Sequence, residues 1–322
     1  MKYNYLGETG IKVSQITLGM MSYGDRRPWQ LEIDEARPFV EKALDLGINF
    51  FDTANMYARG RSEEITGELL KDYRDDVVIA TKVFFPMGDG PNESGLNRYH
   101  VNQQLEKSLE RLQTDRIDLY QIHRRDYNTS WANIMRTLNQ FIDRGGVLHI
   151  GSSSMYAWEL ATANMTAENL GLEPFATLQN HYNAIYREEE REMIPYARQQ
   201  GMGIIPWSPL ARGILAGKYE DKATTKRAET DGLRDWYQSD NDKDVLDAVK
   251  QAADENEISM AQMSLAWLLS RPGVTSPIVG ATKIQHLEEA AEVPDLEIDH
   301  DHFDRISEAY TVRQVAGHSY NS

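Results

Sequence analysis

Eight short runs of apolar and β-branched residues recur along this chain, and amphipathic segments with helical spacing separate most of them. Runs of this length and composition predict β-strands. The expected strands are Ile16–Met21, Asn49–Ala54, Val77–Val83, Ile117–His123, Leu148–Ser154, Ala176–Tyr182, Gly203–Pro209 and Ser276–Ala281. The expected helices include Glu32–Leu46, Ser62–Lys71, Tyr99–Leu112, Trp131–Asp143 and Met193–Gln200. Eight strands that alternate with helices favour an α/β fold of the closed (β/α)8, or TIM-barrel, type.

The segment after the first expected strand argues against an open parallel sheet. Such sheets, when they bind a dinucleotide, usually carry the pattern G-x-G-x-x-G at this point. The segment Leu18–Gly24 reads LGMMSYG and lacks that pattern. The closed barrel is therefore the predicted architecture.

Two segments do not belong to a bare barrel. Tyr3–Tyr5 and Ile11–Val13 flank the glycine-rich turn Leu6–Gly10, which predicts a β-hairpin that closes the bottom of the barrel. Lys218–Lys243, after the seventh strand, is polar and weakly periodic, which predicts a long loop that acts as a lid. The chain shows no interdomain linker or short repeat, so residues 1–322 are expected to form one domain.

Charge and cysteine content exclude several classes of function. The 34 Lys and Arg against 50 Asp and Glu leave a net charge of −16, which disfavours binding to nucleic acid. The chain has no cysteine, so disulfides, thiolate metal sites and cysteine nucleophiles are excluded. The histidines lack metal-ligand spacing, so no metal is expected. No stretch approaches the ~20 apolar residues of a membrane span, and we expect a cytoplasmic protein that does not insert into membranes.

Four polar side chains follow three consecutive predicted strands. Asp52 and Tyr57 lie at and just beyond the end of the second strand, whereas Lys82 and His123 lie at the ends of the third and fourth. The C-terminal ends of barrel strands meet at one mouth, so these side chains are expected to lie together. Each alone has an ordinary structural explanation, such as a helix cap or a buried histidine. Together they favour a catalytic site.

The chemistry that suits this set is carbonyl reduction. Tyrosine is a weak acid, with a reference pKa of about 10, and a neighbouring ammonium group makes it a stronger one. Lys82 would supply that ammonium group, and Asp52 would keep it charged. His123 would hydrogen-bond the substrate oxygen while Tyr57 delivers the proton. No side chain supplies a hydride, so a reduced nicotinamide cofactor is expected.

These residues lie in segments that resemble the aldo-keto reductase family, which uses NADPH. The matching segments are Phe51-Asp52-Thr53-Ala54 with Tyr57, Gly67-Glu68-Leu69-Leu70, Ala80-Thr81-Lys82 and Asp118-Leu119-Tyr120-Gln121-Ile122-His123. The resemblance extends from about Tyr5 to Glu289. It implies a (β/α)8 barrel that reduces an aldehyde or ketone to an alcohol. The implied catalytic tetrad is Asp52, Tyr57, Lys82 and His123, with Tyr57 as the proton donor.

The resemblance also implies residues that bind NADP(H). Ser153, Ser154 and Gln179 correspond to contacts with the nicotinamide carboxamide, although the family often has an asparagine at position 154. Trp207 corresponds to an aromatic residue that stacks on the nicotinamide ring. The loop that covers the pyrophosphate corresponds to Ser208, Leu210, Arg212, Gly213 and Lys218.

The segment after the eighth strand is the expected site for the adenosine end of the cofactor. A helix N-terminus beside a lysine is a ready anion site. In the family this segment holds the adenosine 2′-phosphate and adenine, which favours NADPH over NADH. The corresponding residues are Gly280, Thr282, Lys283, His286 and Glu289, of which His286 replaces a frequent glutamine.

The candidate substrate-pocket residues lie just past the strand ends. They are Tyr23, Met56, Phe84, Phe85, Met87, Arg124 and Tyr156. Aromatic and methionine side chains favour an aldehyde or ketone with an apolar or aryl body. Arg124, next to His123, would instead favour a polar or acidic group. The sequence indicates neither the physiological substrate nor an oligomeric state.

Two other functions remain open at this stage. Trp207–Leu210, Gly217–Tyr219 and Gly280–Ala281 with Leu287 also resemble the potassium-channel β-subunits. Those proteins bind NADPH and dock on a membrane protein, so a regulatory subunit with little turnover is the alternative. A barrel isomerase or hydrolase without a cofactor is the third possibility. Turnover of a reactive aldehyde with NADPH separates the three.

Overall fold

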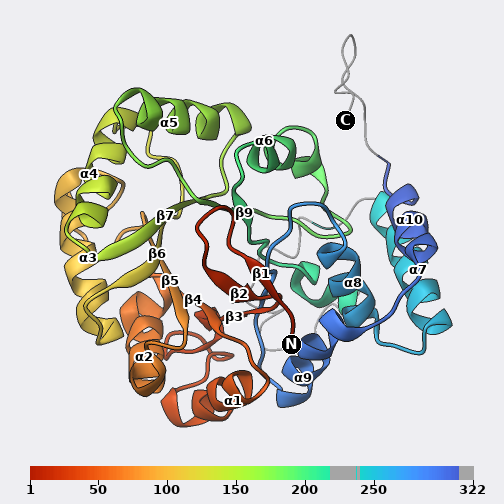
Figure 1. Cartoon of the computed structure of the whole chain (residues 1–322). Coiled ribbons are helices and arrows are strands. Elements are labelled where there is room, and N and C mark those ends of the chain that lie inside the picture. The colour runs from red at the N-terminus through yellow and green to blue at the C-terminus, as the bar shows by residue number, and fades with distance from the viewer. Residues whose placement is uncertain (218–236, 238–239, 312–322) are drawn as a thin grey trace.

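Eight parallel strands form the core of the structure, a computed structural model that describes residues 1–217, 237 and 240–311 (Figure 1). The strands are β3 (Thr17–Gly19), β4 (Phe50–Asp52), β5 (Val78–Val83), β6 (Ile117–Ile122), β7 (Val147–Ser153), β8 (Thr177–Gln179), β9 (Gly203–Ile204) and β10 (Ile278–Val279). Neighbouring strands follow chain order from β3 to β9, and β10 pairs with β3. Each predicted strand is present.

Backbone hydrogen bonds join the two ends of this sheet. Thr275 N donates to Ile204 O at 2.8 Å, and Ile278 N donates to Pro206 O at 2.9 Å. Ile204 also forms a parallel bridge with Val274. These bonds close the ring between β9 and β10, so the predicted (β/α)8 barrel is confirmed.

Helices surround the strands on the outside of the barrel (Figure 1). The α-helices are α1 (Ile33–Asp45), α2 (Arg61–Leu70), α3 (Arg98–Leu112), α4 (Trp131–Asp143), α5 (Ala157–Asn169), α6 (Met193–Gln199), α7 (Asp240–Glu255), α8 (Met260–Leu269), α9 (Ile284–Glu292) and α10 (His300–Glu308). Short 3₁₀ turns are η1 (Met20–Ser22), η2 (Tyr57–Gly60), η3 (Lys71–Tyr73), η4 (Glu188–Glu190), η5 (Ala211–Ala216) and η7 (Val293–Asp295). Among the described residues, no helix has the length and apolar character to cross a membrane.

Helix α4 shows how the sequence specifies these boundaries. The Ser130 side chain accepts a hydrogen bond from Asn133 N and caps the helix start. Ile134, Leu138 and Phe141 recur at helical spacing and are buried against the strands. The predicted and observed bounds of this helix agree.

The N-terminal hairpin consists of β1 (Tyr3–Tyr5) and β2 (Lys12–Ser14), which pair antiparallel as expected. Leu6 and Val13 are fully buried and pack with residues of the barrel interior, among them Phe50 and Leu119. The turn passes so close to β9 that a side chain at Gly7 would meet Gly203 N at 2.6 Å. The hairpin therefore closes the lower end of the barrel (Figure 1).

The expected lid falls for the most part outside the described residues, which omit 218–236 and 238–239. The structure corrects the end of this prediction, because helix α7 begins at Asp240 rather than after Lys243. The segment 244–255 continues with apolar residues at helical spacing, and the helix extends from it toward the N-terminus.

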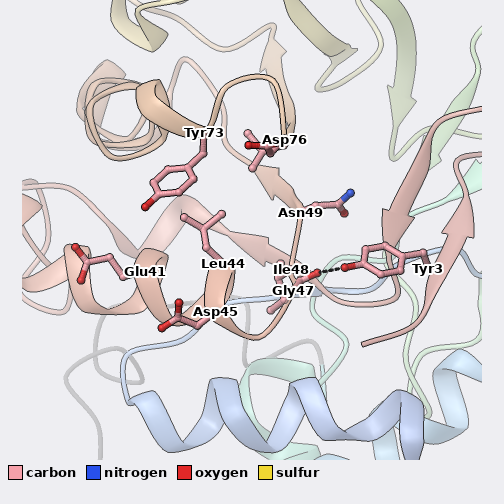
Figure 2. A pocket seen from close by; sticks show the side chains of 10 residues that line it. Tyr3, Glu41, Leu44, Asp45, Gly47, Ile48, Asn49, Tyr73 and Asp76 are labelled. Carbon is pink, nitrogen blue, oxygen red and sulfur yellow. Dashed lines mark hydrogen bonds between the residues drawn. The ribbon is translucent and has the colours of Figure 1, made fainter.

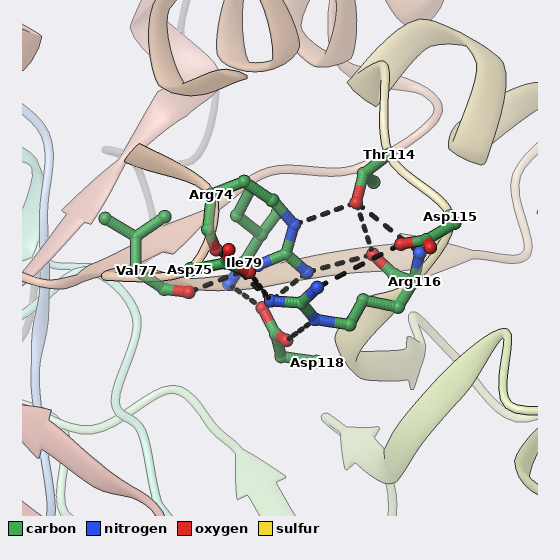
Figure 3. A network of polar contacts seen from close by, with 8 residues as sticks. All are labelled: Arg74, Asp75, Val77, Ile79, Thr114, Asp115, Arg116 and Asp118. Atoms are coloured by element: carbon green, nitrogen blue, oxygen red, sulfur yellow. Dashed lines mark hydrogen bonds and ion pairs between the residues drawn. The ribbon is translucent and has the colours of Figure 1, made fainter. Parts of the chain in front are cut away.

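An ion-pair network joins β5 and β6 at the lower end of the barrel (Figure 3). Asp118 Oδ2 accepts from Ile79 N at 2.7 Å and lies 2.9 Å from Arg74 Nη2. The carboxylate of Asp118 is buried and forms a hydrogen bond with the backbone of β5. Arg116 Nε lies 3.6 Å from the other oxygen of Asp118. These contacts hold the strands whose opposite ends carry Lys82 and His123.

A pocket of about 570 Å³ also lies at the lower end (Figure 2). Residues of β1 and α1 line it, together with the segments that precede β4 and β5. Tyr3 Oη donates to Gly47 O at 2.8 Å across its edge. Asn49 and Val77 line this pocket and come before their strands, so it faces away from the mouth and contains none of the predicted site residues.

Candidate active site

The ends of β4 and β5 bring Lys82 and Asp52 into contact inside the barrel. Lys82 Nζ lies 2.5 Å from Asp52 Oδ1 and donates to Thr53 O at 2.7 Å. Both side chains are buried, with Lys82 0% and Asp52 2% exposed. The strand register explains the contact, because Asp52 is paired with Ala80, two residues before Lys82. A buried ammonium group of this kind requires such a carboxylate partner.

Tyr57 lies beside the Lys82–Asp52 pair. Its Oη is 3.4 Å from Lys82 Nζ, and the ammonium nitrogen is 4.9 Å from the ring centroid. Tyr57 opens the turn η2, and Tyr57 N donates to Ala54 O at 3.0 Å. Ala58 and Arg59 then adopt left-handed backbone conformations, with φ of 48° and 53°, before α2 begins. This sharp turn directs the chain away from the mouth directly after Tyr57.

His123 completes the group. Its ring lies edge-on to Tyr57, with centroids 5.9 Å apart, and Phe85 contacts it at 4.9 Å. Burial lowers the pKa of His123 well below its usual value, and the charges of Lys82 and Arg124 add to the effect. The imidazole is therefore neutral at physiological pH, so one of its nitrogens carries a proton that can be donated.

Lys82 remains charged despite its burial. Burial by itself lowers the pKa of Lys82, but the charges and hydrogen bonds of Asp52 and Tyr57 outweigh it and leave that pKa raised. The structure therefore places a permanent positive charge beside the Tyr57 hydroxyl. It also places the neutral ring of His123, a hydrogen-bond donor, edge-on to the Tyr57 ring. This arrangement can protonate an oxygen atom and stabilise the charge left behind.

A layer of amide side chains, partly missed by the sequence analysis, supports Asp52 from the barrel interior. Gln179 Nε2 donates to Asp52 Oδ2 at 2.8 Å, and Gln121 Nε2 donates to the same oxygen at 3.1 Å. Gln179 Nε2 also lies 3.2 Å from Gln121 Oε1. The residues come from β4, β6 and β8, as expected for a barrel layer built from alternate strands.

Gln121 and Gly151 are two positions beside this layer that the sequence analysis did not assign to the site. Gln121 shares the inward face of β6 with Leu119. The sequence signal that could have identified Gln121 is therefore a polar residue at a position that faces the barrel interior. Gly151 lies opposite it on β7, and a side chain there would meet Gln121 Cγ at 3.0 Å and Thr177 Oγ1 at 2.3 Å. Glycine at 151 therefore leaves the room that Gln121 occupies.

Comparisons with known proteins identify the family of this chain. The model of the Aldo/keto reductase family matches residues 15–311. The chain belongs to this family. Aldo/keto reductases generally use nicotinamide cofactors. As a member of this family, the protein is an oxidoreductase that acts on carbonyl compounds.

Several named relatives are similar to this aldo/keto reductase over nearly their whole length. Versiconal hemiacetal acetate reductase of Aspergillus parasiticus is 39% identical over 98% of both chains. A putative aryl-alcohol dehydrogenase of Schizosaccharomyces pombe is 37% identical over 98% of this chain and 97% of its own. An uncharacterised oxidoreductase of Bacillus subtilis, YrpG, is 36% identical over 93% of each.

The residues expected at the nicotinamide ring of this aldo/keto reductase lie at adjacent strand ends. Ser153 ends β7 and is buried, and Gln179 ends β8. Trp207 Nε1 donates to Ser154 Oγ at 3.0 Å. His181, which the sequence analysis did not assign to the site, stacks on Trp207 with ring centroids 4.2 Å apart. His181 and Ser154 therefore set the orientation of the indole ring.

The predicted pyrophosphate loop follows Trp207 and has an unusual backbone. Ser208, Arg212 and Gly213 all have positive φ, at 54°, 59° and 91°. Asn183 Nδ2 donates to Ser208 O at 2.9 Å and holds the start of this loop. Leu210 precedes the turn η5, and Lys218 lies outside the described residues.

The predicted adenosine site lies at the start of α9. Gly280, Thr282, Lys283 and His286 are exposed there, and Glu289 is half-buried. Lys283 is the N-cap residue, its side chain makes no cap hydrogen bond, and the first turn of α9 has no acidic residue. Glu289 Oε1 accepts from Gln285 Nε2 at 2.7 Å, so that carboxylate is engaged within its own helix.

The predicted substrate-pocket residues separate into three groups. Met56, Phe84, Phe85, Met87 and Arg124 are partly buried beside the catalytic residues or on the loop after β5. Tyr23 has no exposed surface and donates to Ala281 O at 3.3 Å, so it packs beneath the mouth rather than lining it. Tyr156 is 66% exposed and stacks on Trp158 at the start of α5. The structure therefore places Phe85 and Arg124, which both contact His123, closest to the chemistry.

Proposed function

We propose that this protein reduces an aldehyde or ketone to an alcohol, with NADPH as the hydride donor. The observation that carries the proposal is the contact of Lys82 Nζ with Asp52 at 2.5 Å and with Tyr57 Oη at 3.4 Å. A charged ammonium group at this place favours the release of a proton by the Tyr57 hydroxyl. The neutral ring of His123, edge-on to the Tyr57 ring, donates a hydrogen bond to the substrate oxygen.

The residues at the mouth fit a nicotinamide dinucleotide. The donor and acceptor groups of Ser153 and Gln179 suit an amide, and Trp207, held by Ser154, offers an aromatic surface for a flat ring. Gln179 uses its amide nitrogen on Asp52, which leaves its oxygen to accept from a carboxamide N–H. The bound cofactor supplies the hydride, which no amino-acid side chain can supply.

The catalytic side chains then have distinct tasks. Tyr57 Oη donates its proton to the substrate oxygen as that oxygen gains negative charge. Lys82 stabilises the phenolate that forms, and Asp52 keeps Lys82 charged and in place. His123 donates a hydrogen bond from its neutral ring to the same substrate oxygen and orients the carbonyl.

The preference for NADPH over NADH rests on the start of α9. Thr282 and Lys283 offer a hydroxyl and an ammonium group at the N-terminus of α9, which suits a terminal phosphate. The chain carries a net charge of −16, so a local positive site is needed to attract a multiply charged anion. Arg212, on the loop after Trp207, provides a second positive charge for the pyrophosphate.

The experiment is a turnover assay with the purified chain, NADPH and nitrobenzaldehyde. We expect one NADPH to be oxidised for each nitrobenzyl alcohol formed, over many turnovers per protein molecule. Tight retention of NADPH without turnover would support the regulatory-subunit alternative instead. A chain that does not bind NADPH at all would support a cofactor-free barrel enzyme.

A further inference from the structure

Arg124 is a partly buried cation beside the catalytic histidine. Its Nη1 donates to His123 O at 2.6 Å, and its guanidinium carbon lies 5.9 Å from the ring centroid of Phe85. Tyr57 lies edge-on to the ring of the same histidine, His123, with ring centroids 5.9 Å apart. The guanidinium group therefore lies within the same mouth as the proton donor.

No carboxylate neutralises Arg124 within the described ranges of the chain. The catalytic acid at the end of β4, Asp52, is bonded to Lys82 and to two glutamine amides. The next acid along the chain, Asp126, accepts hydrogen bonds from the backbone N–H groups of Leu96 and Asn128. Both acids are therefore engaged elsewhere, and neither reaches Arg124.

Several other partly buried arginines among the described residues have an acid partner, whereas Arg125 and Arg271 form no ion pair there. Arg74 pairs with Asp118 at 2.9 Å, and Arg111 pairs with Glu63 at 2.8 Å. Arg124 has no acid partner among the described residues, and it lies at the mouth beside His123. Burying an unpaired charge costs free energy, and arginine cannot avoid that cost by losing its proton under physiological conditions.

The free N–H groups of Arg124 are available to a ligand. Of its nitrogens only Nη1 has a hydrogen-bond partner among the described residues, and its Nε and Nη2 retain contact with solvent. Burial lowers the pKa of Arg124, and no carboxylate among the described residues forms an ion pair with it. Nε and Nη2 form the edge of a guanidinium group that binds a carboxylate through two parallel hydrogen bonds.

We propose that Arg124 binds a carboxylate carried by the carbonyl substrate, and that the substrates are aryl aldehydes or ketones with an acidic substituent. The inference rests on the proposed function and deepens it. Phe85 contacts both His123, at 4.9 Å, and Arg124, at 5.9 Å. An aryl ring packed against Phe85 can direct its carbonyl toward His123 and its carboxylate toward Arg124.

The test compares meta-carboxybenzaldehyde with its methyl ester, which has nearly the same shape and no charge. We expect Arg124→Gln to lower the ratio of kcat/KM for the acid over the ester by about 10- to 100-fold, the value of a charged hydrogen bond. Arg124→Lys should retain part of the ratio, because it keeps the charge and loses the paired geometry. Arg136→Gln removes an exposed arginine of α4 and should leave the ratio unchanged.

A binding measurement separates this inference from the proposed function. Isophthalate resembles the acid substrate but has no aldehyde to reduce, and its binding to the NADPH complex is measured by calorimetry. We expect binding to the parent protein and to Arg136→Gln, and a loss of at least ten-fold in affinity for Arg124→Gln. If no aldehyde is reduced but isophthalate binds in this pattern, the reductase proposal fails and the carboxylate site stands.

Two outcomes would overturn the inference. The first is an equal fall for acid and ester in Arg124→Gln, which would make Arg124 a support for the His123 backbone alone. The second is isophthalate binding that Arg124→Gln does not weaken. Thermal unfolding of each variant checks that the barrel is intact, and Arg124→Lys keeps the comparison available if Arg124→Gln does not fold.

Discussion

Trp207 donates its indole N–H to the hydroxyl of Ser154, 3.0 Å away, and the ring of His181 covers one of its faces. The residue at 154 is thus bonded to the aromatic platform. A serine reaches Trp207 Nε1 directly and still leaves its backbone N–H to donate to Gln179 O at 3.1 Å. The ends of β7, β8 and β9 are therefore tied together at the expected nicotinamide site.

Ser154→Ala should loosen the indole ring and weaken NADPH binding. One neutral hydrogen bond is lost, so we expect the Kd for NADPH to rise about 3- to 10-fold. Ser154→Thr keeps the hydroxyl and serves as the matched control. Fluorescence titration measures both, and a Kd unchanged in Ser154→Ala would show that His181 alone holds the ring.

Tyr57→Phe should abolish most of the reductase activity without loss of cofactor. The general acid is removed while the ring and its packing remain, so kcat/KM should fall about 100- to 10,000-fold. NADPH affinity, measured by fluorescence, should change little, because Tyr57 acts on the substrate oxygen. Tyr99→Phe, at an exposed position of α3, is the control for loss of a phenol. Near-parental kcat in Tyr57→Phe would contradict the proposed proton donor.

Lys283→Glu should discriminate between the two nicotinamide cofactors. The change removes an ammonium group at the start of α9 and adds a charge that repels phosphate. We expect the Kd for NADPH to rise about 10- to 100-fold and that for NADH to rise much less. Lys250→Glu, at an exposed site of α7, makes the same change in net charge. Equal losses for both cofactors in Lys283→Glu would show that Lys283 does not bind the 2′-phosphate.

Asp118→Asn should destabilise the barrel without altering its chemistry. Asp118 pairs with Arg74 and accepts from Ile79 N below the active site (Figure 3), so the change leaves a partly buried guanidinium without its anion. We expect the free energy of unfolding to fall by about 3 kcal/mol in urea titrations. The activity of the folded protein should persist. Asp75→Asn breaks only an exposed pair with Arg116 and should change stability little.

His181 should make the fold sensitive to acid. Burial lowers the pKa of His181 from 6.5 to about 3, and the charge of Arg212 acts in the same direction. The unfolded chain therefore takes up a proton near pH 6.5 that the folded protein refuses until about pH 3. The free energy of unfolding declines as the pH falls through this window, by up to about 1.4 kcal/mol per pH unit from this group.

His181→Phe keeps the aromatic stack on Trp207 and removes this titration. Its unfolding free energy, measured in urea between about pH 6 and about pH 4, should fall less steeply than that of the parent protein. His300→Gln, at an exposed position, controls for the loss of a histidine. Parallel curves for the parent and His181→Phe would show that other groups cause the acid sensitivity.

The sequence by itself determined the order of strands and helices and the positions of Asp52, Tyr57, Lys82 and His123 along it. Alternating apolar runs and amphipathic segments carry enough local information for this, because burial and hydrogen bonding act on each segment through its own periodicity. Because the C-terminal ends of barrel strands meet at one mouth, this order also predicts that the four side chains lie together. Strand ends were predicted less well, since the last residues of runs such as Gly203–Pro209 leave the ladder for loops.

Only the tertiary structure decided which hydrogen-bond partner each side chain at that mouth has. Gln121 appears in the sequence as one polar residue in a strand, and its bond to Asp52 depends on the register of β4, β6 and β8. The stack of His181 on Trp207 and the absence of an acid partner for Arg124 among the described residues likewise arise from segments far apart in the chain. Local periodicity sets which face a side chain takes, whereas its partners are set by strands that meet only when the barrel closes.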